Sequence, residues 1–193
     1  MKFIGKISLS IAASCLILSG CSQMQKAPPR ATTVAKKITT PISKSIPKWV
    51  NNPALKYSYA ASHCVTSSSN YNTDRATAIK AGVDRLSEQI TAKLGAMDTA
   101  LTEKNSGAGD SLPTLAFGKA SGPAIEFALG SARPIRQENV LMNGREHLCV
   151  LTAISPTYTK ELFDNVVSAS GAQLSVEQTT ALKTVFIPDY ADN

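Results

Sequence analysis

The stretch TDRATAIKAGVDRLSEQITAKL, residues 73–94, decides the fold of this chain. Its large apolar side chains recur at steps of four, three, four and four residues, at Ile79, Val83, Leu86, Ile90 and Leu94. This spacing places them in one stripe along an α-helix, with polar side chains on the other faces. The stretch therefore predicts an amphipathic helix that packs by one face on another layer. Gly95 is expected to end this helix, and residues 96–104 can add a further turn or two.

Two further features of this stretch bear on how the helix is placed. Gly82 lies in the helix interior, where glycine costs about 1 kcal/mol relative to alanine, so its presence indicates close packing against a sheet. At the amino end, Asn72 or Thr73 is expected to cap the helix. Asp74 lies in the first turn, where the positive end of the helix dipole favours a carboxylate.

Three strands are predicted around the helix. Residues 57–66 precede it and alternate between two faces. Residues 131–142 and 145–154 follow it and flank Asn143-Gly144, a dipeptide typical of two-residue hairpins because both turn positions require positive φ. The run LCVL, residues 148–151, is continuously apolar, so the third strand is expected to be central. The sequence thus predicts an α+β fold of two layers, with a three-stranded antiparallel sheet packed against helices.

Three further helices are predicted from the signals at their ends, over residues 123–130, 156–170 and 176–186. Pro123 suits the first turn of the first of them. The second follows Ser155 as its cap and is expected to stop at Gly171. Ser175 and Gln178 form a capping box at the start of the third.

The amino-terminal stretch predicts how the chain is attached to a membrane. Two lysines precede an apolar run, residues 7–18, that is shorter than the ~20 residues needed to span a bilayer. Leu18-Ser19-Gly20-Cys21 ends this run, as in a bacterial lipoprotein signal, in which the cysteine sulfur receives a diacylglycerol. Cys21 is therefore the expected lipidation site, and Ser22 after it favours the outer membrane. An ordinary cleaved signal peptide with a chance cysteine is the alternative.

The positive charge of the chain lies outside the expected domain. The formal net charge is +6, but residues 50–193 hold 12 basic and 14 acidic side chains, so the folded part has no electrostatic footprint for nucleic acid. The preceding tail is basic, rich in Thr, Ser, Ala and Pro, and aperiodic, which is typical of disorder. Its lysines either attract anionic head groups or keep the linker solvated. We expect a signal peptide at 1–20, a lipidated disordered linker at 21–46 and an α+β domain at 47–193.

The positions of the cysteines favour a disulfide bond, and those of the histidines do not favour a catalytic or metal site. Cys64 and Cys149 lie in predicted strands, and an oxidising compartment allows a bridge between them if the strands are neighbours. Two buried free thiols are the alternative. The only histidines are His63 and His147, but His63 and Cys64 point to opposite faces of a strand, which disfavours a metal site. We therefore predict no catalytic residue, no metal, no cofactor and no enzymatic activity.

Several motifs resemble the lipoprotein-20 family of bacterial outer-membrane lipoproteins. They are the segment PKWV at 47–50, the run YNTDRATA at 71–78, and REHLCVL at 145–151 with the helix that follows it. Ala78, Gly82 and Leu86 occupy the spacing of a recurring Ala-x₃-Ala-x₃-Leu pattern of that family. The likeness covers about residues 47–168. The chain departs from the family in its strand cysteines and in Gly82, where alanine is usual.

The resemblance implies an α+β domain at the outer membrane or cell surface, without known enzymatic activity. Some members of the family are structural parts of flagellar basal disks, and others are surface antigens. We expect a lipoprotein with a structural or assembly role in the cell envelope, and a flagellar role is a hypothesis. Its partners would be the membrane, through the lipid, and envelope proteins or further copies of itself. The alternative is a binding module for peptidoglycan or a small ligand, with a pocket near Trp49 or His63.

Overall fold

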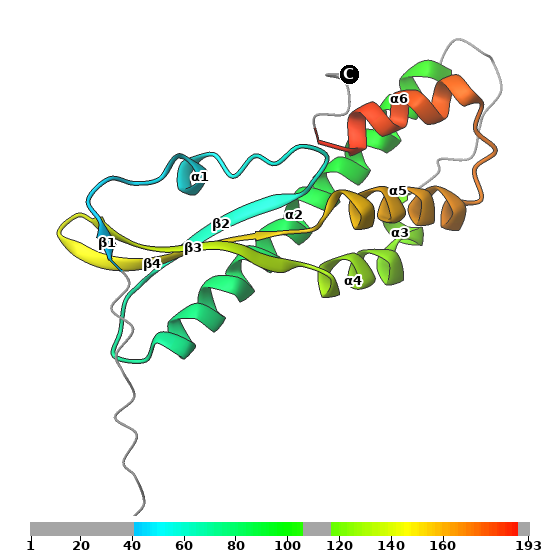
Figure 1. Cartoon of the computed structure of the whole chain (residues 1–193). Coiled ribbons are helices and arrows are strands. Elements are labelled where there is room, and N and C mark those ends of the chain that lie inside the picture. The colour runs from blue at the N-terminus through cyan, green and yellow to red at the C-terminus, as the bar shows by residue number, and fades with distance from the viewer. Residues whose placement is uncertain (1–40, 106–116, 189–193) are drawn as a thin grey trace, which may run out of the picture. The chain divides into compact units, whose positions relative to one another are not determined.

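Helix α2 runs from Tyr71 to Asn105, along one face of a β-sheet and beyond the end of that sheet (Figure 1). The computed structural model describes residues 41–105 and 117–188. They belong to one compact unit, Thr39–Asn193, and the other unit, Met1–Ile38, lies outside the described residues. The predicted stop of the helix at Gly95 is wrong. The helix continues because the apolar stripe continues through Met97 and Leu101, which are both buried.

The amino end of α2 is held by a short polar loop. The side-chain oxygen of Asn70 accepts a hydrogen bond from the backbone N–H of Thr73 at 3.2 Å. The helix therefore begins slightly earlier than predicted, and neither Asn72 nor Thr73 is its cap. The Asp74 carboxylate accepts hydrogen bonds from the backbone N–H of Ser68 at 2.7 Å and from its hydroxyl at 2.8 Å. These bonds fix the loop against the first turn of α2.

The sheet has four strands in the order β1-β3-β4-β2: β1 is Ile42–Ser43, β2 is Ala60–Thr66, β3 is Arg133–Met142 and β4 is Arg145–Ala153. The strands β2 and β3 both pair antiparallel with β4, so the third predicted strand is internal as expected. The predicted three-stranded antiparallel sheet is wrong in one respect. The short strand β1 pairs in parallel with β3, with Ile42 opposite Asn139, which makes the sheet mixed. Because β1 has two residues, it has no periodicity that the sequence could reveal.

Two turns set the limits of the longer strands. The sequence predicts residues 57–59 in the first strand, and this is wrong, because Leu55 and Ser58 close a tight turn in which Tyr57 has a φ of 57°. The strand β2 therefore begins only at Ala60. The predicted hairpin is confirmed, because Asn143 and Gly144 have φ of 51° and 75° between β3 and β4.

Helix α2 packs closely on the sheet at Gly82, as the sequence predicted. A Cβ atom placed on Gly82 would lie 2.9 Å from Oγ1 and 3.1 Å from Cβ of Thr152, in the buried part of β4. Thr152 is fully buried, and its side chain is branched at Cβ, so it has little freedom to move aside. Gly82 thus sets the distance between the helix and the sheet.

We expect Gly82→Ala to lower the free energy of unfolding by about 1 kcal/mol, because overpacking outweighs the gain in helix propensity. Gly95→Ala is the matched control. A Cβ on Gly95 meets no atom within 4 Å, so this change should stabilise the chain. Thr152→Ala should reduce the cost of Gly82→Ala in a double-mutant cycle measured by urea unfolding. If Gly82→Ala lowered the free energy of unfolding equally in the parent chain and in the Thr152→Ala variant, the close contact would be refuted.

The second face of the sheet carries the short helix α1, Lys48–Asn51 (Figure 1). Trp49 packs there against Ala60, Leu151 and Ala153. Because residues paired across neighbouring strands share a face, Ser62 and Cys64 of β2 also lie on the α1 side. The sheet therefore lies between α2 and the segment that contains α1.

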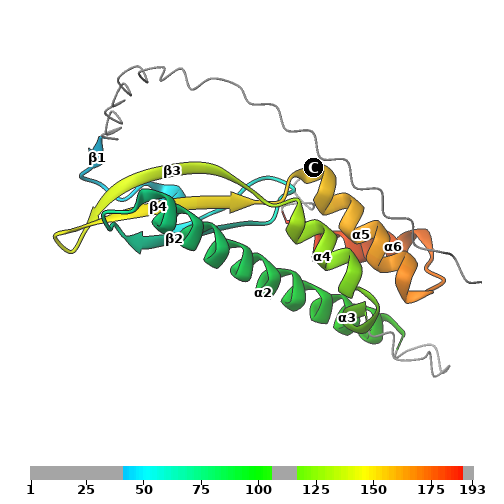
Figure 2. The ribbon, with the colours of Figure 1, turned by 90° about the horizontal axis from the view of Figure 1, so that it is seen from below.

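Four helices gather at the part of α2 that extends past the sheet (Figure 2). They are α3 at Phe117–Ala120, α4 at Gly122–Gly130, α5 at Pro156–Ser170 and α6 at Val176–Phe186. Three of them pack against α2, and α5 packs on α3 and α4. Ser155 caps α5, Gly171 follows it with a φ of 67°, and Ser175 forms a capping box at the start of α6, all as predicted.

A buried hydrogen bond joins the end of α6 to the chain just before β2. The Tyr59 hydroxyl donates to the Phe186 carbonyl oxygen at 2.6 Å, and the two rings meet edge to face at 5.6 Å. Burial raises the pKa of the Tyr59 hydroxyl well above its ordinary value, so this group stays a donor. We call the part of the domain around the sheet the sheet end, and the part formed by α3 to α6 and the carboxyl half of α2 the helical end. The two ends consequently share one core.

Candidate functional site

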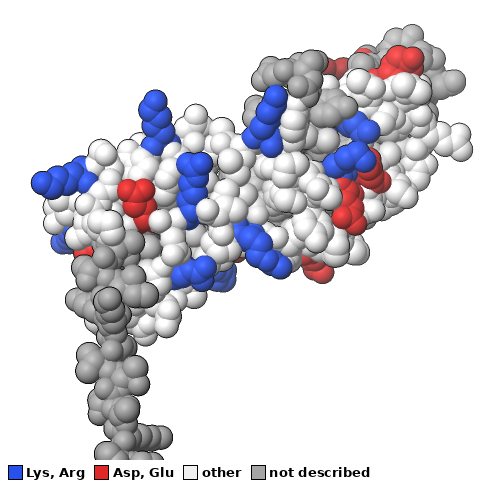
Figure 3. Space-filling model, in the orientation of Figure 1, with Lys and Arg blue, Asp and Glu red and all other residues white. Residues whose placement is uncertain are grey.

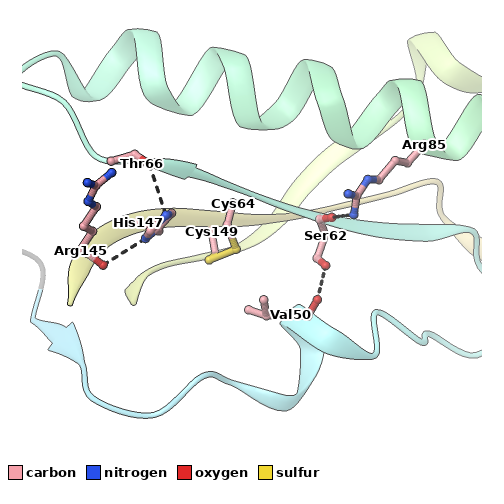
Figure 4. The surroundings of a disulfide bond; sticks show 8 residues. All are labelled: Val50, Ser62, Cys64, Thr66, Arg85, Arg145, His147 and Cys149. Atoms are coloured by element: carbon pink, nitrogen blue, oxygen red, sulfur yellow. Dashed lines mark hydrogen bonds between the residues drawn. A yellow bond between two sulfur atoms is a disulfide. The ribbon is translucent and has the colours of Figure 1, made fainter. Parts of the chain in front are cut away.

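A disulfide bond links the two internal strand cysteines, as the sequence predicted. The register of β2 and β4 places Cys64 opposite Cys149, with their Cα atoms 4.0 Å apart, and the two sulfur atoms are bonded (Figure 4). Cys149 is fully buried, whereas Cys64 is partly exposed. Both cysteines lie on the face that carries α1. Neither sulfur is therefore a free thiol that could act as a nucleophile.

The strand β2 forms one edge of the sheet, and its backbone hydrogen-bonding groups alternate between β4 and the outside. The carbonyl oxygens of Ala60 and Ser62 point outward, because they accept hydrogen bonds from side chains of α2. Gln89 Nε2 donates to Ala60 at 3.1 Å, and Arg85 Nη1 donates to Ser62 at 2.9 Å. By the same alternation, the backbone N–H and C=O groups of Cys64 and Thr66 point outward.

The outward groups of Cys64 and Thr66 have no hydrogen-bond partner among residues 41–105 and 117–188. The side chain of Thr66 lies near His147, with its Oγ1 3.3 Å from Nε2 of the ring. The other ring nitrogen of His147 lies 3.0 Å from the Arg145 carbonyl oxygen (Figure 4). These side-chain contacts position the end of β2. They do not involve the outward backbone groups of this strand, which remain available for hydrogen bonds.

A hollow of about 220 Å³ lies at this edge and is lined by Val50, Ser62, His63, Cys64 and Arg85. Three elements contribute to it, since Val50 belongs to α1 and Arg85 to α2. The Ser62 hydroxyl donates to the Val50 carbonyl oxygen, which holds α1 against the strand (Figure 4). The hollow is thus formed where α1, on one face of the sheet, and α2, on the other face, both reach the free edge of β2.

His63 and Arg85 give the hollow its polar chemistry. The Nδ1 atom of His63 is buried and has no hydrogen-bond partner in the described part of the chain. The pKa of His63 is lowered, mainly because burial disfavours the charged ring and also because the Arg85 guanidinium lies close to it. No carboxylate lies within salt-bridge distance of Arg85 among the described residues. The site therefore offers one permanent positive charge and hydrogen-bond donors, which suit a carboxylate ligand.

The lowered pKa of His63 predicts a pH dependence of stability. A histidine whose folded-state pKa lies below the ordinary 6.5 contributes stability that is present above pH 6.5 and is lost as pH falls below it. We expect the free energy of unfolding to decrease as the pH falls through this range. His63→Gln should remove this part of the decrease, whereas His147→Gln should retain it. Urea unfolding of the three chains at several pH values checks this, and an unchanged pH slope in His63→Gln would contradict it.

Charge on the surrounding surface is unevenly distributed. Residues 41–66 contain Lys44, Lys48 and Lys56 and no acidic side chain. On the face shown in Figure 3, basic side chains outnumber acidic ones over the sheet, and acidic side chains are more frequent around the helical end. A ligand that approaches the sheet from this face therefore meets a mainly positive surface.

The structure places the other predicted site residues as follows. Cys21 lies outside the described residues. Trp49 packs in the apolar cluster on the α1 face and does not line the hollow. Within residues 41–105 and 117–188, no three or more His, Cys, Asp and Glu side chains are grouped so that they could hold a metal ion.

The sequence did not indicate Arg85 as a site residue. Arg85 and Gln89 are separated by one helical turn, so they lie on one flank of the α2 stripe. This spacing was visible in the sequence, but it does not show that the flank faces a strand edge.

None of the helices in the described part of the chain has both the length and the hydropathy of a transmembrane span. Comparisons with known proteins give no match, because no protein-family model, no curated protein and no solved structure matches the chain. The resemblance to the lipoprotein-20 family therefore stays a prediction.

Proposed function

We propose that the chain is an outer-membrane-anchored lipoprotein with a structural or assembly role in the cell envelope. The observation that carries this proposal is the Cys64–Cys149 disulfide, taken together with the predicted lipoprotein signal peptide at 1–20 and the cysteine that follows it at position 21. Disulfides persist in the bacterial periplasm and outside the cell, and they are rare in the cytosol. The bridge and the predicted signal thus support the same compartment.

The role that we propose is non-enzymatic and depends on surface contacts. The two internal cysteines are bonded to each other, and His63 lies on the opposite face of β2, so these residues do not form a nucleophile and base pair. The free edge of β2 instead offers a surface for a protein partner. An association with the flagellum is the more specific form of this proposal, and it depends on the family resemblance alone.

Two experiments in cells test the proposal. Mass spectrometry of the purified mature chain should find a lipid-modified cysteine at position 21 as the first residue, and Cys21→Ser should release the chain from the membrane fraction. Deletion of the gene should impair motility or make the cells sensitive to detergent, and the gene with Cys21→Ser should fail to restore the phenotype. Unmodified Cys21, or a deletion strain with normal motility and a normal envelope, would contradict the proposal.

The hollow beside Arg85 favours a second candidate function, a binding module for peptidoglycan or a small anionic ligand. Peptidoglycan stem peptides carry carboxylates, which suit the guanidinium. A pull-down with purified cell-wall fragments distinguishes the two candidates. Retention that is lost in Arg85→Gln would support the binding module, and no retention would exclude peptidoglycan.

A further inference from the structure

We propose that the free edge of β2 binds an extended, acidic peptide segment of another protein, which adds to the sheet as a further strand and places a carboxylate beside Arg85. This inference deepens the proposed function, because it states the chemistry of the protein partner, and it rests on that function for the compartment in which the partner is met. It uses the edge from Ser62 to Thr66 and the adjoining hollow.

The backbone of β2 supplies the hydrogen bonds for such a strand. Cys64 and Thr66 each present an outward N–H and an outward C=O, and none of these groups has a partner among the described residues. Ser62 presents an outward N–H as well, since its carbonyl oxygen already accepts from Arg85. An added strand would pair with these groups at the ordinary spacing of about 4.8 Å between strands.

The side chains of α2 limit how far the added strand can extend. Gln89 and Arg85 already donate to the carbonyl oxygens of Ala60 and Ser62, so the first part of the edge is satisfied. Side chains used in this way are a common protection of edge strands. The open part of the edge is therefore short, and it suits a segment of about five residues.

Charge indicates what such a segment must carry. Arg85 has no acidic partner in the described part of the chain, and the neighbouring Nδ1 of His63 is buried and unpaired. A carboxylate from the added strand would satisfy the guanidinium with a charge-assisted hydrogen bond. The lysine-bearing segment 41–66, which has no acidic side chain, favours the same sign of ligand.

A second copy of this chain does not fit this site by pairing β2 with β2. Residues 60–67, AASHCVTS, contain no Asp or Glu, so β2 of another copy cannot supply the carboxylate. Such a pairing would also bring the Arg85 of each copy to the same interface. The occupant that the site favours is therefore an acidic segment of a different protein.

The test uses a five-residue peptide of alternating threonine and valine with one central glutamate, capped at both ends, and a matched peptide with glutamine in its place. The protein is the full mature chain with Cys21→Ser, so that no lipid is present. Amide hydrogen exchange at Cys64 and Thr66 is expected to be fast in the free chain. At millimolar glutamate peptide it should slow at least tenfold, and the glutamine peptide should bind about tenfold more weakly.

Substitutions at the edge identify the binding mode. Thr66→Pro removes an outward N–H that β4 does not use, so the strand should stay folded while binding of both peptides is lost. Thr66→Ala keeps this N–H and should bind as the parent does. Arg85→Gln should make the two peptides bind equally. Thermal unfolding of each variant verifies that the fold is retained.

Three results would overturn the inference: unchanged exchange at millimolar peptide, normal binding by Thr66→Pro, or protection of the Cys64 amide by self-association without peptide. Failure of the inference is distinguishable from failure of the proposed function. If the peptide does not bind but Cys21 is lipidated and the deletion phenotype is present, only the inference fails. If the peptide binds but Cys21 carries no lipid, the proposed function fails.

Discussion

Replacing Cys64 and Cys149 together by alanine should lower the free energy of unfolding by about 4–5 kcal/mol. The bridge joins residues 85 positions apart in the sequence, so it removes much of the conformational freedom of the unfolded chain. Burial of Cys149 adds to the effect, since alanine leaves a small void beside its neighbours. Equilibrium unfolding in urea measures the loss.

Reduction provides the control for this prediction. A reducing agent should destabilise the parent chain by a similar amount and should leave the double alanine variant unchanged. A parent chain whose stability does not respond to reduction would show that the bridge contributes little. The double variant is preferred to either single one, because a single substitution leaves one thiol free to form intermolecular bonds.

Phe163→Ala should lower the free energy of unfolding by about 3–5 kcal/mol. Phe163 of α5 is 1% exposed and lies 5.8 Å from the Phe186 ring, measured between ring centres, at the point where the helical end joins the sheet. Its removal leaves a cavity that α2 and α6 cannot easily fill, because Tyr59 ties the end of α6 to the sheet. Urea unfolding again measures the difference.

Phe127→Ala is the matched control for this cavity. Phe127 of α4 is 55% exposed, and its ring contacts Tyr158 at 5.8 Å between centres. The same chemical change should therefore cost only about 0.5–1.5 kcal/mol, the typical contribution of an aromatic pair. Equal costs at the two positions would show that Phe163 is not part of the core.

The sequence predicted those elements whose signals are local. The stripe through Leu86 and Ile90 predicted α2, Asn143-Gly144 predicted the hairpin, and the caps at Ser155 and Ser175 predicted α5 and α6. Each signal acts within a few residues, where backbone geometry and short-range hydrogen bonds decide the outcome. The disulfide could be predicted because it needed only that the strands of Cys64 and Cys149 be neighbours.

Features that depend on distant contacts could not be predicted. The strand β1 consists of Ile42 and Ser43 and exists through its pairing with β3, which lies nearly a hundred residues later in the chain. Gly95 has the sequence signature of a helix end. The burial of Met97 and Leu101, however, stabilises the continued helix by more than a single glycine destabilises it. The role of Arg85 depends on which strand lies at the edge of the sheet, and no local pattern encodes this.

The continuity of α2 has a mechanical consequence. Its 35 residues form a rod roughly 50 Å long that is shared by the sheet and the helical end. No loop interrupts this rod, so the two ends have no hinge between them, and a pull on one is transmitted along hydrogen-bonded backbone to the other. A protein built in this way transmits force between its two ends with little bending of the segment that joins them.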